Sequence, residues 1–350
     1  MNADFIIVGQ GIAGTVLAHR LEEYKQRVVV ISHPSLSASS AVAAGIWNPI
    51  VFKRLTKSWM ADEILPELHA FYGSCGHKLH QNFLSERAII KPFTEVQEAT
   101  LWQKKSAEGN QYLDGKIYSD FDLSEKDHAT RYSKVLEAGN LHMQEFLERS
   151  REYFISGESY LEDNFEFESL STTPDGVSYK HIRARYIVFC EGHLVRKNPF
   201  FGFIPMKPAK GEVLTIHCKG IRLEKDIFNK NLFIMPLGND LYKVGATYAW
   251  DKLNDFPTDE GKEELLAKLQ QILTIPFEII HHQAGVRPSV IDRRPVLGKH
   301  ASNERVAIFN GLGTKGVMLA PYFSGILTEH LIHGQPVPAE VDINRFFDAV

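Results

Sequence analysis

The sequence predicts an α/β fold with two interleaved domains, and three patterns along the chain point to it. A strand–helix–strand unit over residues 4–31 predicts the start of a parallel sheet. Strand patterns between residues 211 and 248, with a turn at 238–240, predict an antiparallel sheet. A further buried strand and helix near the C terminus predict that the end of the chain completes the first sheet.

Length and composition are those of an ordinary globular protein. The chain has 350 residues, 44% of them hydrophobic and 23% charged, which is enough for roughly two domains with a core that needs no structural metal. The formal net charge of −4 argues against an electrostatically driven nucleic-acid binder. The histidines and cysteines do not show the spacing of metal ligands, so we expect no metal site.

The expected location follows from the cysteines and from hydropathy. Cys75, Cys190 and Cys218 form an odd, widely spaced set, which is typical of reduced thiols in a reducing compartment. No apolar run approaches the roughly 18 residues of a membrane helix, and the first predicted strand begins at Asp4, which leaves no room for a signal peptide. We therefore expect a cytoplasmic protein with no membrane partner.

The N-terminal unit consists of an apolar run at 4–8 (DFIIV), a helix over 12–24 and a second apolar run at 28–31 (VVVI). The helix is predicted because Val16 and Leu17 fall on the same face as Leu21. The two apolar runs are short and rich in β-branched residues, as buried parallel strands are.

The rest of the chain continues the alternation of helices and strands. The predicted elements are helices around 61–72 and 143–153, strands within 160–190 around a turn at 174–176, strands at 211–217, 232–235 and 241–248, a helix over 263–273, a strand at 306–310 and a last helix over 315–332. The run at 186–190 (YIVFC) is apolar throughout, so we expect it to rejoin the parallel sheet.

The turn after the first strand carries a Gly-x-Gly-x-x-Gly motif, which is typical of dinucleotide-binding Rossmann folds. Gly9 permits the tight turn, Gly11 lets the backbone approach a diphosphate, and Gly14 allows the helix to pack closely on the strand. The diphosphate would then lie at the positive N terminus of the helix. The predicted contacts come from the whole turn: Gly9, Gln10, Gly11, Ile12, Ala13 and Gly14.

An acidic residue normally follows this motif by about twenty positions and binds the ribose hydroxyls. Here the second strand ends at Ser32 and His33, without a carboxylate. These two residues are the candidate ribose contacts, and a solvated loop histidine is the alternative for His33. No arginine follows that could recognise a 2′-phosphate, so nothing in the motif favours NADP.

A stretch of small residues follows at 38–49 (ASSAVAAGIWNP). Small side chains let backbone amides approach a diphosphate, and serine hydroxyls can donate to phosphate oxygens. This stretch resembles the flavin-contacting loop of the D-amino acid oxidase and glycine oxidase family, and its VAAGIWNP core is especially similar to D-amino acid oxidases. The resemblance implies FAD as the cofactor, with contacts from Ser39, Ser40, Ala43, Ala44, Gly45 and Trp47.

Later segments resemble the same family in the same order. They are IVFCEG at 187–192, KGEV at 210–213, FIMP at 233–236 with VGAT at 244–247, AGVRP at 284–288, PVLG at 295–298 and GLGTKG at 311–316. The resemblance covers most of the chain and is weakest between about 53 and 140. It implies that the turn at Gly192 lies near the cofactor.

The resemblance also implies a fold: a Rossmann-like FAD-binding domain of the glutathione-reductase type, with an interleaved α+β substrate domain built on an antiparallel sheet. We expect the FAD-binding domain to be discontinuous, because its motifs lie at the start, middle and end of the chain. The expected boundaries are 1–75, 140–203 and 289–350 for the FAD-binding domain, and 76–139 and 204–288 for the substrate domain.

The glycine-rich turn at 311–316 precedes the last helix, so free backbone N–H groups and a positive helix end face it. Negative charge on a reduced flavin would be stabilised there. For Lys315, an exposed lysine without a role is the alternative. By resemblance, the turn meets the flavin ring through Gly313, Thr314, Lys315, Gly316 and Val317.

Arg287 is the candidate catalytic residue. In the glycine oxidase branch of the family, the arginine of the GLRP motif pairs with the substrate carboxylate, and a guanidinium suits that bidentate bond. The alternative is a structural arginine. The family hairpin often carries a tyrosine where this chain has Phe233, and Tyr242 or Tyr248 could supply the missing hydroxyl. Some sarcosine-oxidase-like relatives of the family tether the flavin through a cysteine late in the chain; no cysteine follows Cys218 here, so the resemblance implies non-covalent FAD.

These features predict an FAD-dependent oxidoreductase that oxidises the C–N bond of an amino acid or secondary amine. A hydride would pass from the substrate carbon to flavin N5 and leave an imine that hydrolyses, with oxygen or another acceptor taking the electrons. Three alternatives stay open: oxidation of a 2-hydroxy acid in the same site, action on a modified transfer-RNA uridine, and a non-catalytic dinucleotide-binding protein. The balanced charge favours a small-molecule substrate over nucleic acid.

Overall fold

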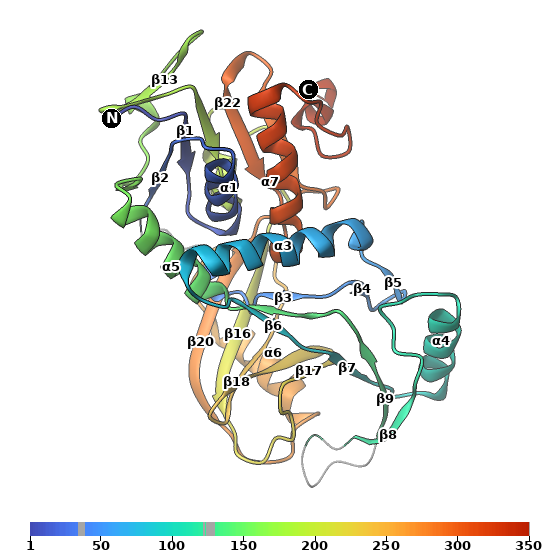
Figure 1. Cartoon of the computed structure of the whole chain (residues 1–350). Coiled ribbons are helices and arrows are strands. Elements are labelled where there is room, and N and C mark those ends of the chain that lie inside the picture. The colour runs from blue at the N-terminus through green and yellow to red at the C-terminus, as the bar shows by residue number, and fades with distance from the viewer. Residues whose placement is uncertain (34–38, 122, 124–129, 350) are drawn as a thin grey trace.

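Two large sheets organise the computed structural model, which describes residues 1–33, 39–121, 123 and 130–349. The six-stranded sheet lies in the upper part of Figure 1. Its strands, in spatial order, are β11 (Tyr160–Glu162), β2 (Val28–Ser32), β1 (Phe5–Val8), β15 (Tyr186–Phe189), β22 (Asn303–Asn310) and β21 (Val296–His300). The prediction that the start, middle and end of the chain share one sheet is confirmed for these strands.

The centre of this sheet is parallel and buried on both faces. Phe5 pairs with Val28 of β2 on one side and with Tyr186 of β15 on the other, and β22 continues the parallel order. Only β21 runs antiparallel, at the edge. All four residues of β1 are buried, which explains why the sequence here is apolar throughout instead of alternating.

The eight-stranded sheet lies in the lower part of Figure 1. Its strands, in spatial order, are β20 (Glu278–Arg287), β16 (Ala209–His217), β19 (Leu241–Gly245), β18 (Leu232–Gly238), β17 (Ile227–Lys230), β7 (Ile89–Pro92), β9 (Thr130–Val135) and β8 (Tyr118–Phe121). All neighbours pair antiparallel except β17 and β7. The predicted antiparallel sheet is therefore present, and it is larger than the three strands expected.

The remaining strands of the described residues form three short sheets. They are formed by β3 (Ile46–Trp47), β10 (Gly139–Leu141) and β6 (Leu84–Glu86); by β12 (Leu170–Thr173), β13 (Gly176–Tyr179) and β14 (Ile182–Ala184); and by β4 (Ile50–Val51) with β5 (Thr56–Lys57). The predicted turn at 174–176 joins β12 to β13.

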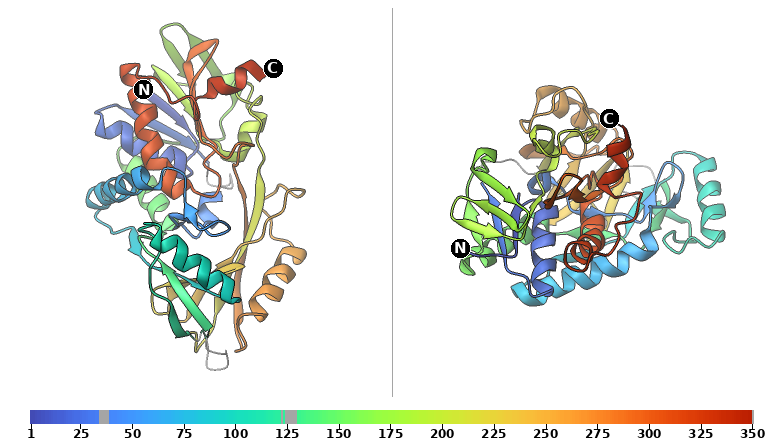
Figure 2. Two further views of the ribbon diagram at one scale, coloured as in Figure 1. Left: turned by 90° about the vertical axis from the view of Figure 1, so that its right-hand side faces the viewer. Right: turned by 90° about the horizontal axis from the view of Figure 1, so that it is seen from above.

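Seven α-helices lie in the described part of the chain: α1 (Ile12–Glu23), α2 (Ser39–Val42), α3 (Ala61–Leu79), α4 (Val96–Ala107), α5 (Met143–Ser156), α6 (Asp259–Gln270) and α7 (Gly316–His333). Short 3₁₀ helices cover Phe167–Ser169, Gly192–Lys197 and Ile343–Ala349. Helices α1 and α7 lie side by side against the six-stranded sheet, and α3 crosses the middle of the molecule beneath them (Figures 1 and 2).

The differences from the predicted elements have local causes. The predicted strand 241–248 ends at Gly245, because the chain then leaves β18 and pairs only with β16 at Ala249. Helix α4 was not predicted; its two buried residues, Ala99 and Trp102, are too few to set a clear apolar period. Ala38 of the small-residue motif lies outside the described residues. The expected domain boundaries stay a prediction.

Within the described residues, no helix combines the length and apolar character needed to cross a membrane.

Candidate active site

A cavity of about 1030 Å³ is lined by residues of both large sheets. Four of the lining residues follow or end strands of the six-stranded sheet: Gly9 after β1, Ser32 in β2, Glu191 after β15 and Asn310 in β22. The carboxyl ends of parallel strands are where ligands bind in open α/β sheets. The volume lies at the upper end of the usual range for small-molecule pockets, so a dinucleotide and a small substrate can share it.

Two glycines of the motif lie where a side chain would not fit. Gly9 has φ +100°, and a Cβ on it would lie 2.6 Å from the carbonyl oxygen of Cys190. A Cβ on Gly14 would overlap the carbonyl oxygen of Gly9. Gly9 therefore keeps the cavity wall free of side chains, whereas Gly14 packs helix against strand and does not line the cavity. Both positions agree with the roles that the sequence predicts for them.

Two helix N termini meet at this wall. Helix α1 begins at Ile12, whose backbone N–H donates to Ser40 Oγ at 3.0 Å, and helix α7 begins at Gly316. A Cβ on Gly316 would lie 2.9 Å from Ile12 Cγ2, so the two helix ends touch because this residue is glycine. Two positive helix ends on one cavity favour anionic groups there.

The predicted ribose contacts, Ser32 and His33, line the cavity at the end of β2. Arg151 of α5 lines it as well, and its Nε donates to Oε1 of Gln10 at 2.7 Å. Gln10 in turn donates to the carbonyl of Leu147 at 2.8 Å, so the motif is tied to α5. Sequence reasoning missed Arg151, because it lies far from the motif in the chain, on a helix whose pattern indicates only packing.

A buried thiol and carboxyl lie where β15 ends. Burial raises the pKa of Glu191 to about 7, although the Asn198 amide donates to its carboxylate at 2.6 Å. Burial also raises the pKa of the Cys190 thiol well above its ordinary value. Both residues line the cavity, next to the predicted contact Gly192, and neither was singled out from sequence.

Lys315 reaches into the cavity from the turn before α7. Its Nζ donates to Ser58 Oγ at 2.7 Å, and burial, together with the nearby Arg294 charge, lowers the pKa of its ammonium. The alternative of an exposed lysine is therefore wrong. Its ammonium has no carboxylate partner among the described residues.

Arg287 ends β20 and lines the opposite wall of the cavity. Its Nη1 donates to the carbonyls of Lys210 at 3.3 Å and Thr247 at 3.2 Å. A Cβ on Gly211 would overlap the guanidinium, so the fork lies over this glycine. Burial lowers the pKa of Arg287, and no carboxylate of the described residues forms an ion pair with it.

The structure separates the two tyrosines that could replace the family hydroxyl. Tyr242 is buried in the core of the eight-stranded sheet, where its hydroxyl lies 3.4 Å from the carbonyl of Ile221. Tyr248 lines the cavity instead, with its ring 4.1 Å from Cζ of Arg287. Phe233 lines the cavity two strands away from Gly211.

A further wall of the cavity was not predicted. Lys91 comes from β7, Trp102 from α4, and Phe93 from the chain between them. Asn229 of β17, the strand next to β7, also lines this wall. Lys91 lies 3.5 Å from Glu98, which also lines the cavity. This wall comes from the region where the family resemblance is weakest, so no motif marks it.

Most predicted contacts do come together. Those that line the cavity are Gly9, Gln10, Gly11, Ile12, Ala13, Ser32, His33, Ser39, Ser40, Ala43, Ala44, Gly45, Gly192, Arg287, Gly313, Thr314, Lys315, Gly316 and Val317. Trp47 does not line it: its ring is fully buried under Gly139, and its Nε1 donates to the carbonyl of Glu137. Across the described ranges, no group of His, Cys, Asp and Glu residues could hold a metal ion.

A comparison with protein families identifies the family and its cofactor. A family model described as FAD dependent oxidoreductase matches residues 4–330. The chain belongs to this family. FAD is therefore the cofactor of this chain. The turn at Gly9, which has no side chain, and the N termini of α1 and α7 fit the diphosphate of a dinucleotide.

Similarity to the curated glycine oxidases covers a smaller part of the chain than the family model does. A glycine oxidase of Bacillus licheniformis is 33% identical over 135 residues, which cover 38% of this chain and 36% of that protein. The similarity to the curated glycine oxidases spans less than half of their length.

Solved structures match over nearly the whole chain. Glycine oxidase from Geobacillus kaustophilus superposes with a TM-score of 0.78 at 18% identity, covering 99% of this chain and 98% of that one. Iminodiacetate oxidase from Chelativorans sp. BNC1 superposes with a TM-score of 0.75 at 17% identity, covering 96% and 97%. At these identities the likeness concerns the fold, and it agrees with the predicted Rossmann-like architecture.

Proposed function

We propose that this FAD-dependent oxidoreductase oxidises the C–N bond of an amino acid, or of a secondary amine that carries a carboxylate. The observation that carries the proposal is Arg287, a partly buried guanidinium on the cavity wall without a carboxylate partner among the described residues. Charges that lose water in proteins are normally paired, so an anionic group of the ligand is the partner that we propose for it. The glycine oxidase similarity supports an amino acid as its source.

Arg287 is arranged to bind a carboxylate. The two carbonyls that accept from Nη1 hold the guanidinium in place, and the ring of Tyr248 supports one face. Nη2 and Nε have no protein partner among the described residues, so two donors stay available for a bidentate bond. A carboxylate held in this way fixes where the α-carbon of the substrate lies.

The cavity wall formed by the strands beside Arg287 is apolar at three positions. Val213 and Phe233 lie on the cavity face of the eight-stranded sheet, and Gly245 lies between them in register. These three residues offer no hydrogen-bonding side chain, so an amine beside them loses water; Asn229, which pairs with Phe233 on the next strand, is a polar lining residue nearby. A neutral amine, which is the reactive form, is favoured in such surroundings.

When bound, FAD supplies the two-electron oxidation; the protein binds, orients and desolvates. Residues at the α7 N terminus, including Lys315, place positive potential at the other side of the cavity. We assign the diphosphate to the α1 N terminus with Gly9, Gly11 and Ser40, and the flavin ring to the turn 313–317. Hydride removal needs no protein acid or base, so the scheme relies on orientation and electrostatics alone.

The test is anaerobic bleaching of the flavin absorbance by a panel of amines, amino acids and 2-hydroxy acids. Amino acids or carboxylated secondary amines should bleach the flavin, and simple amines of equal size should not. Bleaching by hydroxy acids alone would replace the proposal by 2-hydroxy acid oxidation. Protein that fails to take up FAD would contradict the enzymatic assignment altogether.

A further inference from the structure

Strand β16 has a different kind of residue on each face. Gly211 and Val213 line the cavity, whereas Lys210 and Glu212 alternate with them and point to the opposite face, toward α6. Both charged residues are buried: Lys210 is 1% exposed and Glu212 is 3% exposed. Lys210 Nζ lies 3.4 Å from Glu212 Oε1. A buried ion pair seldom adds stability over an apolar pair, so its place behind the site calls for another explanation.

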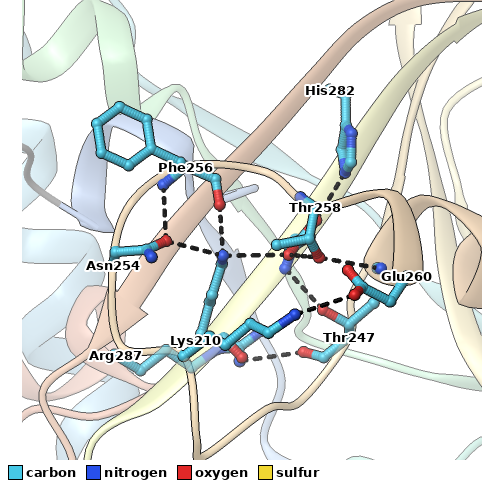
Figure 3. Close-up of polar contacts among 11 residues, drawn as sticks. Lys210, Thr247, Asn254, Phe256, Thr258, Glu260, His282 and Arg287 are labelled. Atoms are coloured by element: carbon cyan, nitrogen blue, oxygen red, sulfur yellow. Dashed lines mark hydrogen bonds and ion pairs between the residues drawn. The ribbon is translucent and has the colours of Figure 1, made fainter.

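The side chains of the buried pair hold the far end of the segment 246–258, which connects β19 to α6. Lys210 Nζ donates to Asn254 Oδ1 at 3.0 Å and to the carbonyl of Phe256, as Figure 3 shows. Glu212 accepts from the backbone N–H of Thr258 at 3.0 Å and from its hydroxyl at 2.8 Å. Thr258 also caps the N terminus of α6, so the carboxylate lies at a positive helix end.

The same pair connects β16 to the strand that carries Arg287. His282 of β20 lies with Nε2 2.8 Å from Glu212 Oε2. In register, Glu212 pairs with Ala284 and Gly211 with Gly285, so β20 runs along β16 up to Arg287. The pair therefore contacts both pieces of chain that meet at the guanidinium.

The held segment supplies the groups that position Arg287. Thr247 gives a carbonyl acceptor for Nη1, and Tyr248 gives the ring that supports the guanidinium. Backbone bonds fix this part on β16: Lys210 N–H donates to the carbonyl of Ala249 at 2.8 Å, and Glu212 N–H donates to Thr247 Oγ1 at 2.9 Å. Figure 3 shows Arg287, Lys210 and Thr247 in this arrangement.

We propose that Lys210 and Glu212 are positioning residues for the carboxylate site: they fix the segment 246–258 on β16 and, through Thr247 and Tyr248, hold the Arg287 guanidinium in place. This inference rests on the proposed function, because it takes Arg287 as the carboxylate-binding group. The pair lies on the reverse face of the sheet and does not line the cavity, so neither residue touches substrate or FAD. Their loss should therefore weaken carboxylate binding and leave FAD binding intact.

The test measures the affinity of the FAD-saturated protein for acetate, from the change it causes in the flavin spectrum, alongside the affinity for FAD. The main variant is Lys210→Met with Glu212→Gln, which removes both charges and leaves no unpaired ion. Glu212→Gln alone keeps the shape of the side chain but leaves the Lys210 ammonium with neutral acceptors only. Lys210→Arg is the conservative variant, because it keeps both charges. The matched control is Lys252→Met, because Lys252 binds Glu260 at 3.0 Å on the exposed side of the same segment.

We expect the double variant to bind acetate about tenfold to a hundredfold more weakly, as misplaced binding groups do. FAD affinity should stay within about threefold, because a positioning role spares the cofactor. Lys210→Arg should keep most of the acetate affinity of the parent protein. Lys252→Met should bind acetate as tightly as the parent protein does. In an Arg287→Ala background the double variant should have no further effect, since both act through the same group.

Each contrary outcome has a separate meaning. If Arg287→Ala leaves acetate affinity unchanged, the proposed function fails, whatever the pair does. If Arg287→Ala weakens acetate but neither the double variant nor Glu212→Gln does, the positioning role is overturned. An equal loss of FAD affinity, or losses that add to that of Arg287→Ala, would show a general structural role instead and would overturn it as well. Should the double variant not fold, Glu212→Gln and Lys210→Arg decide the question.

Discussion

Tyr248 lies against the guanidinium of Arg287, with its ring centroid 4.1 Å from Cζ. The contact occurs on the cavity wall, over the space that Gly211 leaves free. Two backbone carbonyls take hydrogen bonds from Nη1, but no carboxylate of the described residues neutralises the charge. This cation is therefore available to the carboxylate of the substrate that we propose.

Replacing Arg287 should separate substrate binding from cofactor binding. Arg287→Ala removes the anion partner, and we expect carboxylate affinity to fall roughly a hundredfold, as for the loss of a charge-assisted bidentate bond. Arg287→Lys keeps the charge but not the fork, so it should recover only part of the loss. Stopped-flow reduction of the flavin over a range of substrate concentrations measures both. Equal kinetics in Arg287→Ala and the parent protein would exclude the assignment.

Replacing Tyr248 should show which part of the ring matters. Tyr248→Phe keeps the ring under the guanidinium and should change substrate affinity little if stacking dominates. Tyr248→Leu removes the cation–π contact, which is worth about 0.5–1 kcal/mol for a half-exposed ring, so affinity should fall about twofold to fivefold. The same flavin-reduction assay compares them. A large loss already in Tyr248→Phe would instead assign a role to the hydroxyl.

A side chain at Gly9 should abolish cofactor binding. Gly9→Ala places a Cβ 2.6 Å from the Cys190 carbonyl oxygen, at a φ of +100° that L residues rarely adopt. We expect the variant apoprotein to take up no FAD. Uptake is measured by the return of flavin absorbance to the protein. Gly325→Ala is the control, because a Cβ there meets nothing within 4 Å and adds helix propensity to α7. Normal FAD uptake by Gly9→Ala would contradict the assignment of the FAD diphosphate to the turn at Gly9.

Glu191 should make stability depend on pH. Its pKa is raised to about 7 by burial, so the folded state holds a proton that the unfolded chain has released. The stabilisation from that proton is present below the unfolded pKa and is lost as pH rises through about 7.

Glu191→Gln cannot lose a proton, so it should become more stable than the parent as pH rises from 5 to 8, by on the order of 3 kcal/mol at most. Urea unfolding of the FAD-saturated proteins at several pH values measures the difference. Glu63→Gln, at an exposed position on α3, serves as the control and should show no such trend. A difference that is constant across this range would mean that Glu191 is ionised throughout.

The parts of the fold that the sequence predicts well are those set by local chemistry. The glycines of 9–14 are needed by a turn within a few residues, so the motif, the first strand and α1 are all visible in the chain. The turn 311–316 is similar, because it directly precedes α7. In these places one short segment determines both its own shape and its contacts.

The rest depends on contacts between distant segments. Phe93 and Trp102 reach the cavity only because β7 joins β17, far away in the chain, and no local pattern records that pairing. Arg151 reaches the glycine motif through the packing of α5, where it donates to Gln10, 141 residues away in the chain. Trp47 shows the reverse error: it follows a cofactor loop in sequence, but its large ring packs under Gly139 of β10 instead of facing the cavity.

The most direct test of the account compares three matched compounds on the FAD-bound protein without oxygen: an amino acid, its methyl ester and its 2-hydroxy analogue. The measured quantity is the rate at which each bleaches the flavin absorbance. If Arg287 binds the carboxylate of an amino acid, the free amino acid should bleach the flavin, the ester should bleach it at least about a hundredfold more slowly, and the hydroxy acid should bleach it little. Equal rates for acid and ester, or bleaching by the hydroxy acid alone, would contradict it.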